Sequence, residues 1–380
     1  MRILYIAPRF HTNQAALMKG WRENGHEVRF LSHYRGKTED YAEVQPLVVG
    51  YSRIFMLADF IWMKIIRRHD ENANLMKLRW GFPPLFKLAS LIRGFAPDVV
   101  ILRERSVYTI CATAICRLYG FPTLLYDQSP LWDHGVKNDI PHRLVRLLTP
   151  KYRITPVELR GLDYTSLVKI PHSFFAPFVM EPQVAPKDKA YFRKGRINLF
   201  SVGKYQKRKN HHLLLAVFSE LLPRYNLHLT IAGEVSDRFQ RRYLHALRKY
   251  VAKRQLEDRV TLLCNLNRQE MYREYSRADI HIQPATREPA GYSIIEAMAF
   301  ALPVVGSSDN GTANYITPGV TGEVFRDGDK EDLKRKLESV IKDKENIPRM
   351  GTAGYQAVLD KHQFANYYQV VRRIMCRGGC

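Results

Sequence analysis

Short apolar runs alternate with longer amphipathic stretches along the first half of the chain. The apolar runs predict strands and the amphipathic stretches predict helices, because buried parallel strands read as nearly continuous apolar segments. Strands are predicted at 3–7, 28–32, 98–102 and 123–126, and helices at about 13–24 and 106–119. Strands that alternate with helices are typical of a doubly wound α/β sheet.

A second series of the same kind begins after residue 196. Strands are predicted at 197–202, 227–232, 260–263, 280–283 and 303–306, and helices at about 210–222, 236–253, 268–277 and 292–301. Three prolines among charges, at 177, 182 and 186, are typical of a linker between the two series. We therefore expect two Rossmann-like domains, 1–180 and 190–362, with a final helix in 363–380 that crosses back to the first domain.

The 380 residues include 59 Lys and Arg against 37 Asp and Glu, which gives a net charge of +22. Such a chain attracts polyanions, whether nucleic acid, anionic lipid or phosphate-bearing substrates. The sequence has no base-reading or stacking motif, so we expect no nucleic-acid partner. It has no secretory signal and no apolar run of the roughly 18 residues that a membrane span needs, which predicts a cytoplasmic protein.

Residues 61–94 mix large apolar side chains with seven cations, against which stand only Asp70 and Glu71. The cations are Lys64, Arg67, Arg68, Lys77, Arg79, Lys87 and Arg93. A basic helix with Trp and Phe on its other face is typical of a protein at a membrane interface. We expect this stretch to bind an anionic membrane surface, peripherally on the inner face of the cell membrane; the alternative is a helix that packs on the sheet.

A basic loop follows the predicted strand at 197–202. Gly203 permits a tight turn and a close approach of an anion, and four cations follow within six residues. Ligands of open α/β sheets bind beyond the carboxyl ends of the strands, so the loop predicts a diphosphate clamp with Lys204 and Lys209 as contacts. The alternative is a solvated basic loop.

Two glutamates follow the predicted strand at 280–283, Glu288 in the loop and Glu296 in the next helix. Eight residues of helix span about 12 Å, which suits a glycosidase pair about 5–9.5 Å apart poorly. Two separate hydrogen-bonding roles fit the spacing better, because carboxylates accept from sugar and ribose hydroxyls. The alternative is a charge at a helix start and a glutamate facing solvent.

The Glu288-to-Glu296 segment resembles the Glu-x7-Glu motif of the retaining glycosyltransferases of family 4, which have the GT-B fold. Further blocks of that family are matched in the same order along the chain. They are Ser201–Lys204, Lys209-Asn210, Ile231–Glu234, Asp258–Leu262, Ala278–Ile280, Leu302–Val305 and Gly322–Phe325.

The resemblance implies a role for each residue of the glutamate motif. Glu288 would contact hydroxyls of the transferred sugar, and Glu296 would hold the ribose of the nucleotide. Backbone amides near Gly291, Tyr292 and Ser293 would meet the diphosphate.

Two other loops also gain roles from the resemblance. Asn265 and Leu266 would border the base, and Lys204 and Lys209 would neutralise the leaving diphosphate in place of a metal ion. We therefore expect no metal and no cofactor other than the UDP- or GDP-linked sugar itself.

The acceptor side is less well marked, since many relatives place a histidine after the strand that corresponds to 123–126. Asp127 stands there in this chain and is our candidate for orienting or deprotonating the acceptor, with His134 as a weaker one. A buried aspartate that caps the loop is the alternative.

The resemblance implies retaining, metal-independent transfer of a hexose to a glycan or lipid-linked acceptor, in polysaccharide or glycolipid assembly. The alternatives are a sugar-nucleotide epimerase or a polysaccharide synthase on the same fold, and a nucleic-acid-binding protein. A nicotinamide enzyme is disfavoured, since no Gly-x-Gly-x-x-Gly follows the first strand.

Overall fold

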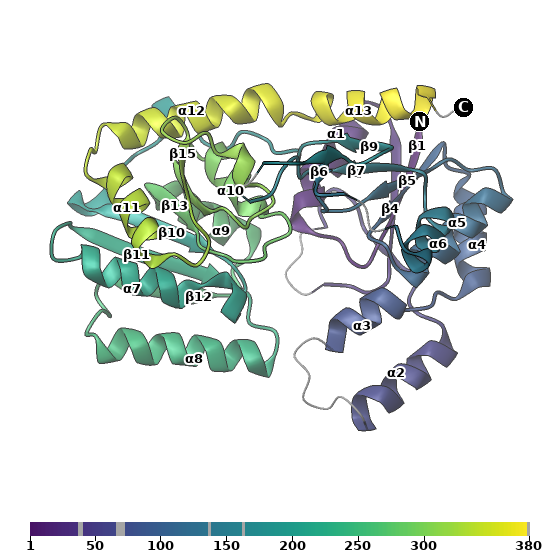
Figure 1. The fold of residues 1–380 in the computed structure, drawn as a ribbon, viewed down its shortest axis with the longest axis horizontal. Coiled ribbons are helices and arrows are strands. Elements are labelled where there is room, and N and C mark those ends of the chain that lie inside the picture. Colours follow the sequence, from purple (N-terminus) through teal and green to yellow (C-terminus); the bar gives the residue numbers. More distant parts are fainter. Residues whose placement is uncertain (37–40, 66–72, 136–137, 162–163, 378–380) are drawn as a thin grey trace. The chain divides into compact units, whose positions relative to one another are not determined.

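A computed structural model describes residues 1–36, 41–65, 73–135, 138–161 and 164–377 (Figure 1). Contacts divide the chain into two compact units. Unit 1 comprises Met1–Pro156, Leu167–Val179 and Phe364–Cys380, and unit 2 comprises Val157–Ser166 and Met180–Gln363. The short segment 157–166 therefore leaves the first unit, contributes to the second, and returns.

Unit 1 is built on a parallel sheet. Its strands are β1 (Arg2–Ala7), β2 (Glu27–Ser32), β3 (Leu47–Val48), β4 (Val99–Arg103), β5 (Thr123–Tyr126), β7 (Tyr152–Thr155) and β9 (Ser173–Phe175). Among the described residues they lie in the order β3-β2-β1-β4-β5-β7-β9. Beside them β6 (Trp132–Asp133) pairs with β8 (Val168–Lys169) in an antiparallel ladder.

Helices cover both faces of this sheet. The helices of unit 1 are α1 (Ala15–Glu23), α2 (Arg53–Ile65), α3 (Ala73–Trp80), α4 (Leu85–Phe95), α5 (Val107–Leu118), α6 (Ile140–Leu148) and α13 (Phe364–Arg377), of which α1, α4, α5 and α13 contribute to the two cores on the sheet. Alternate residues of β1 show the two layers: Ile3 and Tyr5 belong to the core that includes α1 and α13. Leu4 and Ile6 belong to the core that includes α4 and α5.

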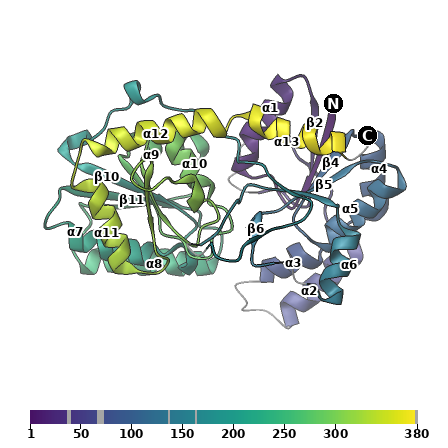
Figure 2. The same cartoon turned by 45° about the horizontal axis from the view of Figure 1, so that its top comes forward.

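The final helix, α13, packs on α1 within unit 1 (Figures 1 and 2). The rings of Trp21 and Phe364 meet edge to face with their centroids 5.0 Å apart. A Cβ on Gly20 would lie 2.3 Å from the Phe364 ring, so the close approach of these helices requires glycine there.

Unit 2 repeats the plan with a second parallel sheet. Its strands are β10 (Ile197–Val202), β11 (Leu227–Gly233), β12 (Val260–Cys264), β13 (Ile280–Gln283), β14 (Val304–Ser307) and β15 (Gly322–Phe325). Its helices are α7 (His211–Leu221), α8 (Arg238–Lys253), α9 (Arg268–Arg277), α10 (Tyr292–Ala299), α11 (Lys330–Ile341) and α12 (Asn346–Lys361). In the described part of the chain the strand order is β12-β11-β10-β13-β14-β15.

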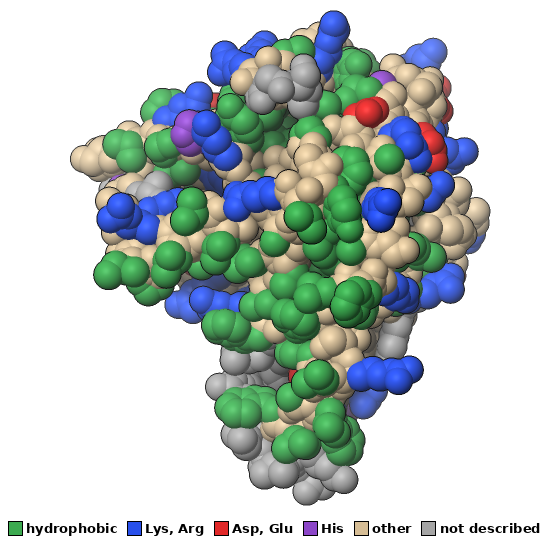
Figure 3. Space-filling view, turned by 90° about the vertical axis from the view of Figure 1, so that its right-hand side faces the viewer, with side chains coloured by type: hydrophobic (Ala, Val, Ile, Leu, Met, Phe, Trp, Pro, Cys, Tyr) green, Lys and Arg blue, Asp and Glu red, His purple; other side chains and the backbone are tan. Residues whose placement is uncertain are grey.

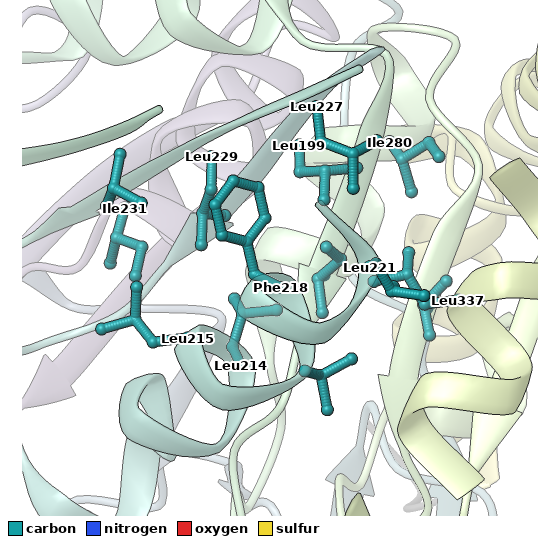
Figure 4. Close-up of a cluster of buried hydrophobic side chains, with 14 of the residues drawn as sticks. Leu199, Leu214, Leu215, Phe218, Leu221, Leu227, Leu229, Ile231, Ile280 and Leu337 are labelled. Carbon is teal, nitrogen blue, oxygen red and sulfur yellow. The ribbon is translucent and has the colours of Figure 1, made fainter. Parts of the chain in front are cut away.

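The core of unit 2 forms where apolar strand residues meet α7 and α11 (Figure 4). Leu199 of β10 faces this cluster, which includes Leu214 and Phe218 of α7. The next residue, Phe200, points to the opposite face, where its ring packs edge to face on Tyr275 of α9 at 4.9 Å. Because both faces of the sheet are covered, its strands carry apolar residues on both faces, as Leu199 and Phe200 of β10 do.

The stretch 61–94, in which the sequence indicates a basic helix, is not a single helix. The region forms parts of α2, α3 and α4, because Gly81, Pro83 and Pro84 interrupt the helical backbone before α4. The cations Arg67 and Arg68 lie outside the described residues.

Lys77, another cation of that stretch, forms an ion pair within the chain. Its ammonium lies 3.1 Å from the carboxylate of Asp59 and the side chain is only partly exposed. In the described parts of the chain, no helix combines the length and the apolarity needed to cross a membrane.

Candidate functional site

The basic loop after β10 is shaped by Gly203. A Cβ at this position would lie 2.9 Å from Cδ of Lys209, so the glycine leaves the space through which the lysine side chain passes. Residues Lys207–Lys209 form a single 3-10 turn immediately before α7. This turn buries Lys209, whose side chain is 10% exposed.

Lys209 and its neighbour Arg208 converge on one carboxylate oxygen of Glu288. The Lys209 ammonium donates to Glu288 Oε2 at 2.5 Å, and the Arg208 guanidinium donates to the same atom at 2.7 Å. The structure therefore brings together Lys209 and Glu288, which the sequence marked separately. It also adds Arg208, which the sequence showed only as one charge of a basic run.

The charges of this cluster determine whether Glu288 is ionised. Burial by itself raises the pKa of a carboxyl, but the Lys209 and Arg208 cations outweigh it and lower the pKa of Glu288 below its usual value. Glu288 is therefore ionised at neutral pH and neutralises one of the two cations.

The backbone of Glu288 is held by the loop after β14. Its amide donates to the carbonyl of Asp309, and its own carbonyl accepts from the amide of Gly311. Arg287, just before it, adopts a left-handed conformation with φ of +48°. These constraints position the carboxylate towards the loop after β10, where the two cations meet it.

Lys204 has a different partner. Its ammonium lies 2.9 Å from the carboxylate of Glu234, at the end of β11. Lys204 and Lys209 thus flank the same loop but do not share an acceptor. Their proposed joint role towards a diphosphate stays a prediction.

Gly291 precedes the first residue of α10 and packs against Asn310. Its amide donates to Asn310 Oδ1 at 3.0 Å, so this amide is already engaged within the protein. A Cβ on Gly291 would lie 2.6 Å from Asn310 Nδ2, which explains the glycine. Asn310 is fully buried, and no local pattern marks it, because it lies 19 residues further along the chain in another loop.

Tyr292 and Ser293 begin α10, and their side chains face inward. The Tyr292 hydroxyl donates to the sulfur of Met180 at 3.3 Å. Ser293 Oγ accepts from the side-chain amide of Gln283 at 2.7 Å. We therefore expect Tyr292 and Ser293 to contribute to ligand binding through their backbone amides at the start of the helix. This role stays a prediction.

Glu296 belongs to a separate cluster of tyrosines. The hydroxyl of Tyr275 donates to its Oε2 at 3.0 Å. Burial raises the pKa of Glu296 to about 7, and the Tyr275 hydrogen bond and the Arg268 charge offset only part of this rise. Unlike Glu288, Glu296 is close to half ionised at neutral pH, which supports separate roles for the two glutamates.

Asn265 stabilises the neighbouring loop after β11. It has a φ of +56°, and its side-chain amide exchanges hydrogen bonds with the backbone of Val235 at 2.8 and 3.2 Å. Leu266 follows it and is partly buried. Both lie at the carboxyl end of β12, where the predicted base contacts would form.

Asp127 lies at the carboxyl end of β5 in unit 1 and is 6% exposed. Its Oδ1 accepts from Arg153 at 2.8 Å and from the amide of Ser129 at 3.1 Å. Arg105 lies 3.6 Å from its Oδ2. This geometry fits the capping alternative, because Arg153 and the Ser129 amide already occupy Oδ1 of the carboxylate; its role towards an acceptor stays a prediction.

The second half of the chain is similar in sequence to known proteins. Residues 186–357 match the sequence model of the family described as Glycosyl transferases group 1. The chain is 30% identical over 181 residues to YqgM of Bacillus subtilis, named as an uncharacterized glycosyltransferase. It is 29% identical over 162 residues to D-inositol 3-phosphate glycosyltransferase of Pseudarthrobacter chlorophenolicus. These matches cover 46% and 42% of this chain, and the chain spans about half or less of each relative, 49% and 38%.

The solved structures extend the likeness to both units. HepE of Anabaena in complex with UDP-glucose matches with a TM-score of 0.69 at 13% identity, over 98% of this chain and 99% of that chain. A likeness at this identity concerns the fold alone. It confirms the GT-B fold expected from the sequence, with a Rossmann-like sheet in each unit.

Proposed function

We propose that this protein is a glycosyltransferase that uses a nucleotide-sugar donor, because residues 186–357 match the model of the family described as Glycosyl transferases group 1. The cluster of Glu288 with Arg208 and Lys209 is the observation that carries this proposal. A carboxylate accepts from sugar hydroxyls, and a pair of cations stabilises the charge that grows on a departing diphosphate. Within the protein Glu288 neutralises one of the two cations, and a donor offers each of these groups a new partner.

The finer part of the proposal concerns the donor and the mechanism. We propose a UDP- or GDP-linked hexose, transferred with retention and without a metal ion. The UDP-glucose bound by HepE supports a nucleotide-sugar donor, and the cations of the loop after β10 support a metal-free departure of the diphosphate. The acceptor we propose is a glycan or a lipid-linked glycan, in polysaccharide or glycolipid assembly.

Slow donor hydrolysis tests this function without knowledge of the acceptor. The purified protein, incubated with a panel of UDP- and GDP-sugars and excess EDTA, is expected to release nucleotide from one of them. Nucleotide release is measured by chromatography. Release from none of the donors would overturn the function, and a strict requirement for Mg²⁺ or Mn²⁺ would overturn the metal-free mechanism alone.

Nucleotide binding is expected to depend on pH through Glu296. The ionised carboxylate accepts from both hydroxyls of a ribose, whereas its protonated form offers fewer lone pairs. The pKa of about 7 means that the ionised fraction falls as the pH drops through neutrality. Affinity for free nucleotide should therefore decrease about tenfold from pH 8 to pH 6.

Calorimetry with UDP and GDP over this range measures the effect. The nucleotide itself titrates, so Glu296→Gln serves as the reference that keeps the nucleotide's contribution and removes that of the protein. The variant should bind more weakly and with a flatter profile. A profile as steep as that of the wild type would show that Glu296 does not meet the ribose.

We also propose that unit 1 binds an anionic membrane surface. Helix α2 exposes large apolar side chains, with Ile54 at 84%, Leu57 at 63% and Phe60 at 59%. On the face shown in Figure 3, hydrophobic side chains gather towards the lower end and Lys and Arg far outnumber Asp and Glu. Apolar anchors among cations are typical of proteins that lie at a membrane interface.

Sedimentation with vesicles tests the membrane proposal. The wild type should sediment with anionic vesicles and not with neutral ones, since each cation near an anionic surface contributes about 1 kcal/mol. Leu57→Ser combined with Phe60→Ser should release the protein from the vesicles. Val320→Ser combined with Leu359→Ser, which changes two exposed apolar residues of unit 2, is the matched control. Equal sedimentation of both variants would contradict the proposal.

A further inference from the structure

A hollow of about 1550 Å³ opens in unit 1 along α6. It extends from the loop after β4, at Arg105 and Ser106, to the residues around Lys151 that lead into β7. Binding sites for small molecules enclose about 300–1,000 Å³, so this hollow, which we call the arginine hollow, suits a ligand longer than a single sugar. The hollow lies outside residues 186–357, the part of the chain that matches the family model. Its ligand therefore has to be inferred from the side chains that line it.

The lining of the arginine hollow is strongly basic. Among the described residues, seven Lys and Arg side chains line it against two acidic ones. The cations are Arg79, Arg105, Arg117, Arg143, Arg146, Lys151 and Arg153, and the acids are Glu104 and Asp133. A concave surface of one sign concentrates ligands of the opposite sign.

Some of these cations serve the fold. Arg153 is 4% exposed and bonds to Asp127, Ser173 and two backbone carbonyls. Arg117 and Arg146 donate to Thr149 and Asn138. These three maintain the walls of the hollow.

Three other cations of the lining are not neutralised by a carboxylate of their own. Arg143 and Lys151 are exposed, and within the described residues neither has a carboxylate within 4.0 Å. Arg105 lies near Asp127, but Arg153 already neutralises that carboxylate at 2.8 Å. Arg105, Arg143 and Lys151 therefore present positive charge to whatever occupies the hollow.

We propose that the arginine hollow binds the acceptor and that this acceptor is an extended acidic glycan. Its carboxylate, phosphate or sulfate groups meet Arg105, Arg143 and Lys151 along the hollow, and its sugar rings occupy the space between them. The word acceptor rests on the proposed glycosyltransferase function; the anionic ligand does not.

The lining favours a glycan over single-stranded nucleic acid. Nucleic-acid grooves combine positive charge with aromatic rings on which successive bases stack. Among the described lining residues, Trp80 is the only Phe, Tyr or Trp. Serine, asparagine and histidine side chains, which hydrogen-bond to sugar hydroxyls, are more numerous.

A pair of oligosaccharides of equal length tests the proposal. Calorimetry in the presence of saturating UDP and GDP, which keeps the nucleotide site occupied, compares pentagalacturonate with neutral maltopentaose. We expect pentagalacturonate to bind at least tenfold more tightly, with an affinity that falls with salt. Equal binding of the two sugars, or no binding of either, would overturn the proposal.

Two triple variants separate a site from the general charge of the protein. Arg105→Gln, Arg143→Gln and Lys151→Gln together should weaken pentagalacturonate binding about tenfold. The matched control removes three exposed cations of α8 with Arg241→Gln, Arg242→Gln and Lys249→Gln, and should bind as the wild type does. Equal losses in both variants would show that bulk charge alone attracts the ligand.

Two further outcomes are decisive. A pentanucleotide that binds more tightly than pentagalacturonate, and that the hollow variant loses, would replace the glycan by nucleic acid. The wild-type donor assay separates this inference from the proposed function. Pentagalacturonate binding without donor hydrolysis would leave the acidic-ligand site and refute the transferase, and donor hydrolysis without such binding would refute the site alone.

Discussion

Replacement of Lys209 by alanine is expected to slow sugar transfer by about 10²- to 10³-fold, the usual cost of losing one group that stabilises transition-state charge. The side chain is buried beside Gly203 and carries its ammonium to the strand ends of unit 2. A cation held in this way needs no reorganisation when charge develops on the leaving diphosphate, and burial strengthens its effect. Steady-state kinetics with the donor identified by hydrolysis measures the loss.

The ion pair between Lys336 and Glu323 provides the control. Its atoms are 2.6 Å apart and partly buried, between α11 and β15. Lys336→Ala should therefore cost comparable stability in thermal unfolding and leave the rate nearly unchanged. If both lysine variants slowed transfer equally, the effect of Lys209 would be one of stability and not of catalysis.

Lys204→Ala should have a smaller effect than Lys209→Ala. Its side chain is 34% exposed and its partner is Glu234. Solvent screens such a charge more than a buried one. The sequence alone gives the two lysines equal standing, since both lie in the same loop.

Most strands of the two parallel sheets were predictable because each is an apolar run with its own boundaries, but β3, β7, β9 and β15 were not predicted. The segment 197–202 has apolar residues on both faces, and the structure has β10 at those residues. The role of Gly203 was also predictable, since a glycine between a strand and a basic run indicates a close approach of other atoms. What the sequence could not show is that the approaching atoms belong to Lys209 itself.

Contacts between segments far apart in the sequence could not be predicted. Glu288 and Arg208 are 80 residues apart, and Gly291 and Asn310 are 19 apart. Nothing in a local pattern specifies which residue a side chain meets across a sheet. Asp127 shows the consequence: the loop position was evident, but its pairing with Arg153 comes from β7, a strand that the sequence analysis did not identify.

Glu288→Gln is expected to slow transfer about 10²-fold, on the scale of about 1.5–3 kcal/mol for a hydrogen bond to a charged group. The substitution keeps the shape of the side chain but removes the charge that Arg208 and Lys209 share. If Glu288 meets the transferred sugar, affinity for free nucleotide should fall less than in Glu296→Ala. Calorimetry with nucleotide and kinetics with the donor separate the two effects, and equal losses of nucleotide affinity would refute the division of roles.

The double variant Glu288→Gln with Lys209→Ala shows whether carboxylate and ammonium act as one unit. Residues 2.5 Å apart are expected to be strongly coupled, so the double variant should be little slower than Lys209→Ala alone. Glu323→Gln, which breaks the comparable pair with Lys336, is the control for loss of a partly buried carboxylate. Rate losses that simply multiply would mean that Glu288 and Lys209 contact the donor independently. The hydrogen bond between them would then keep both side chains in place without contributing to the reaction.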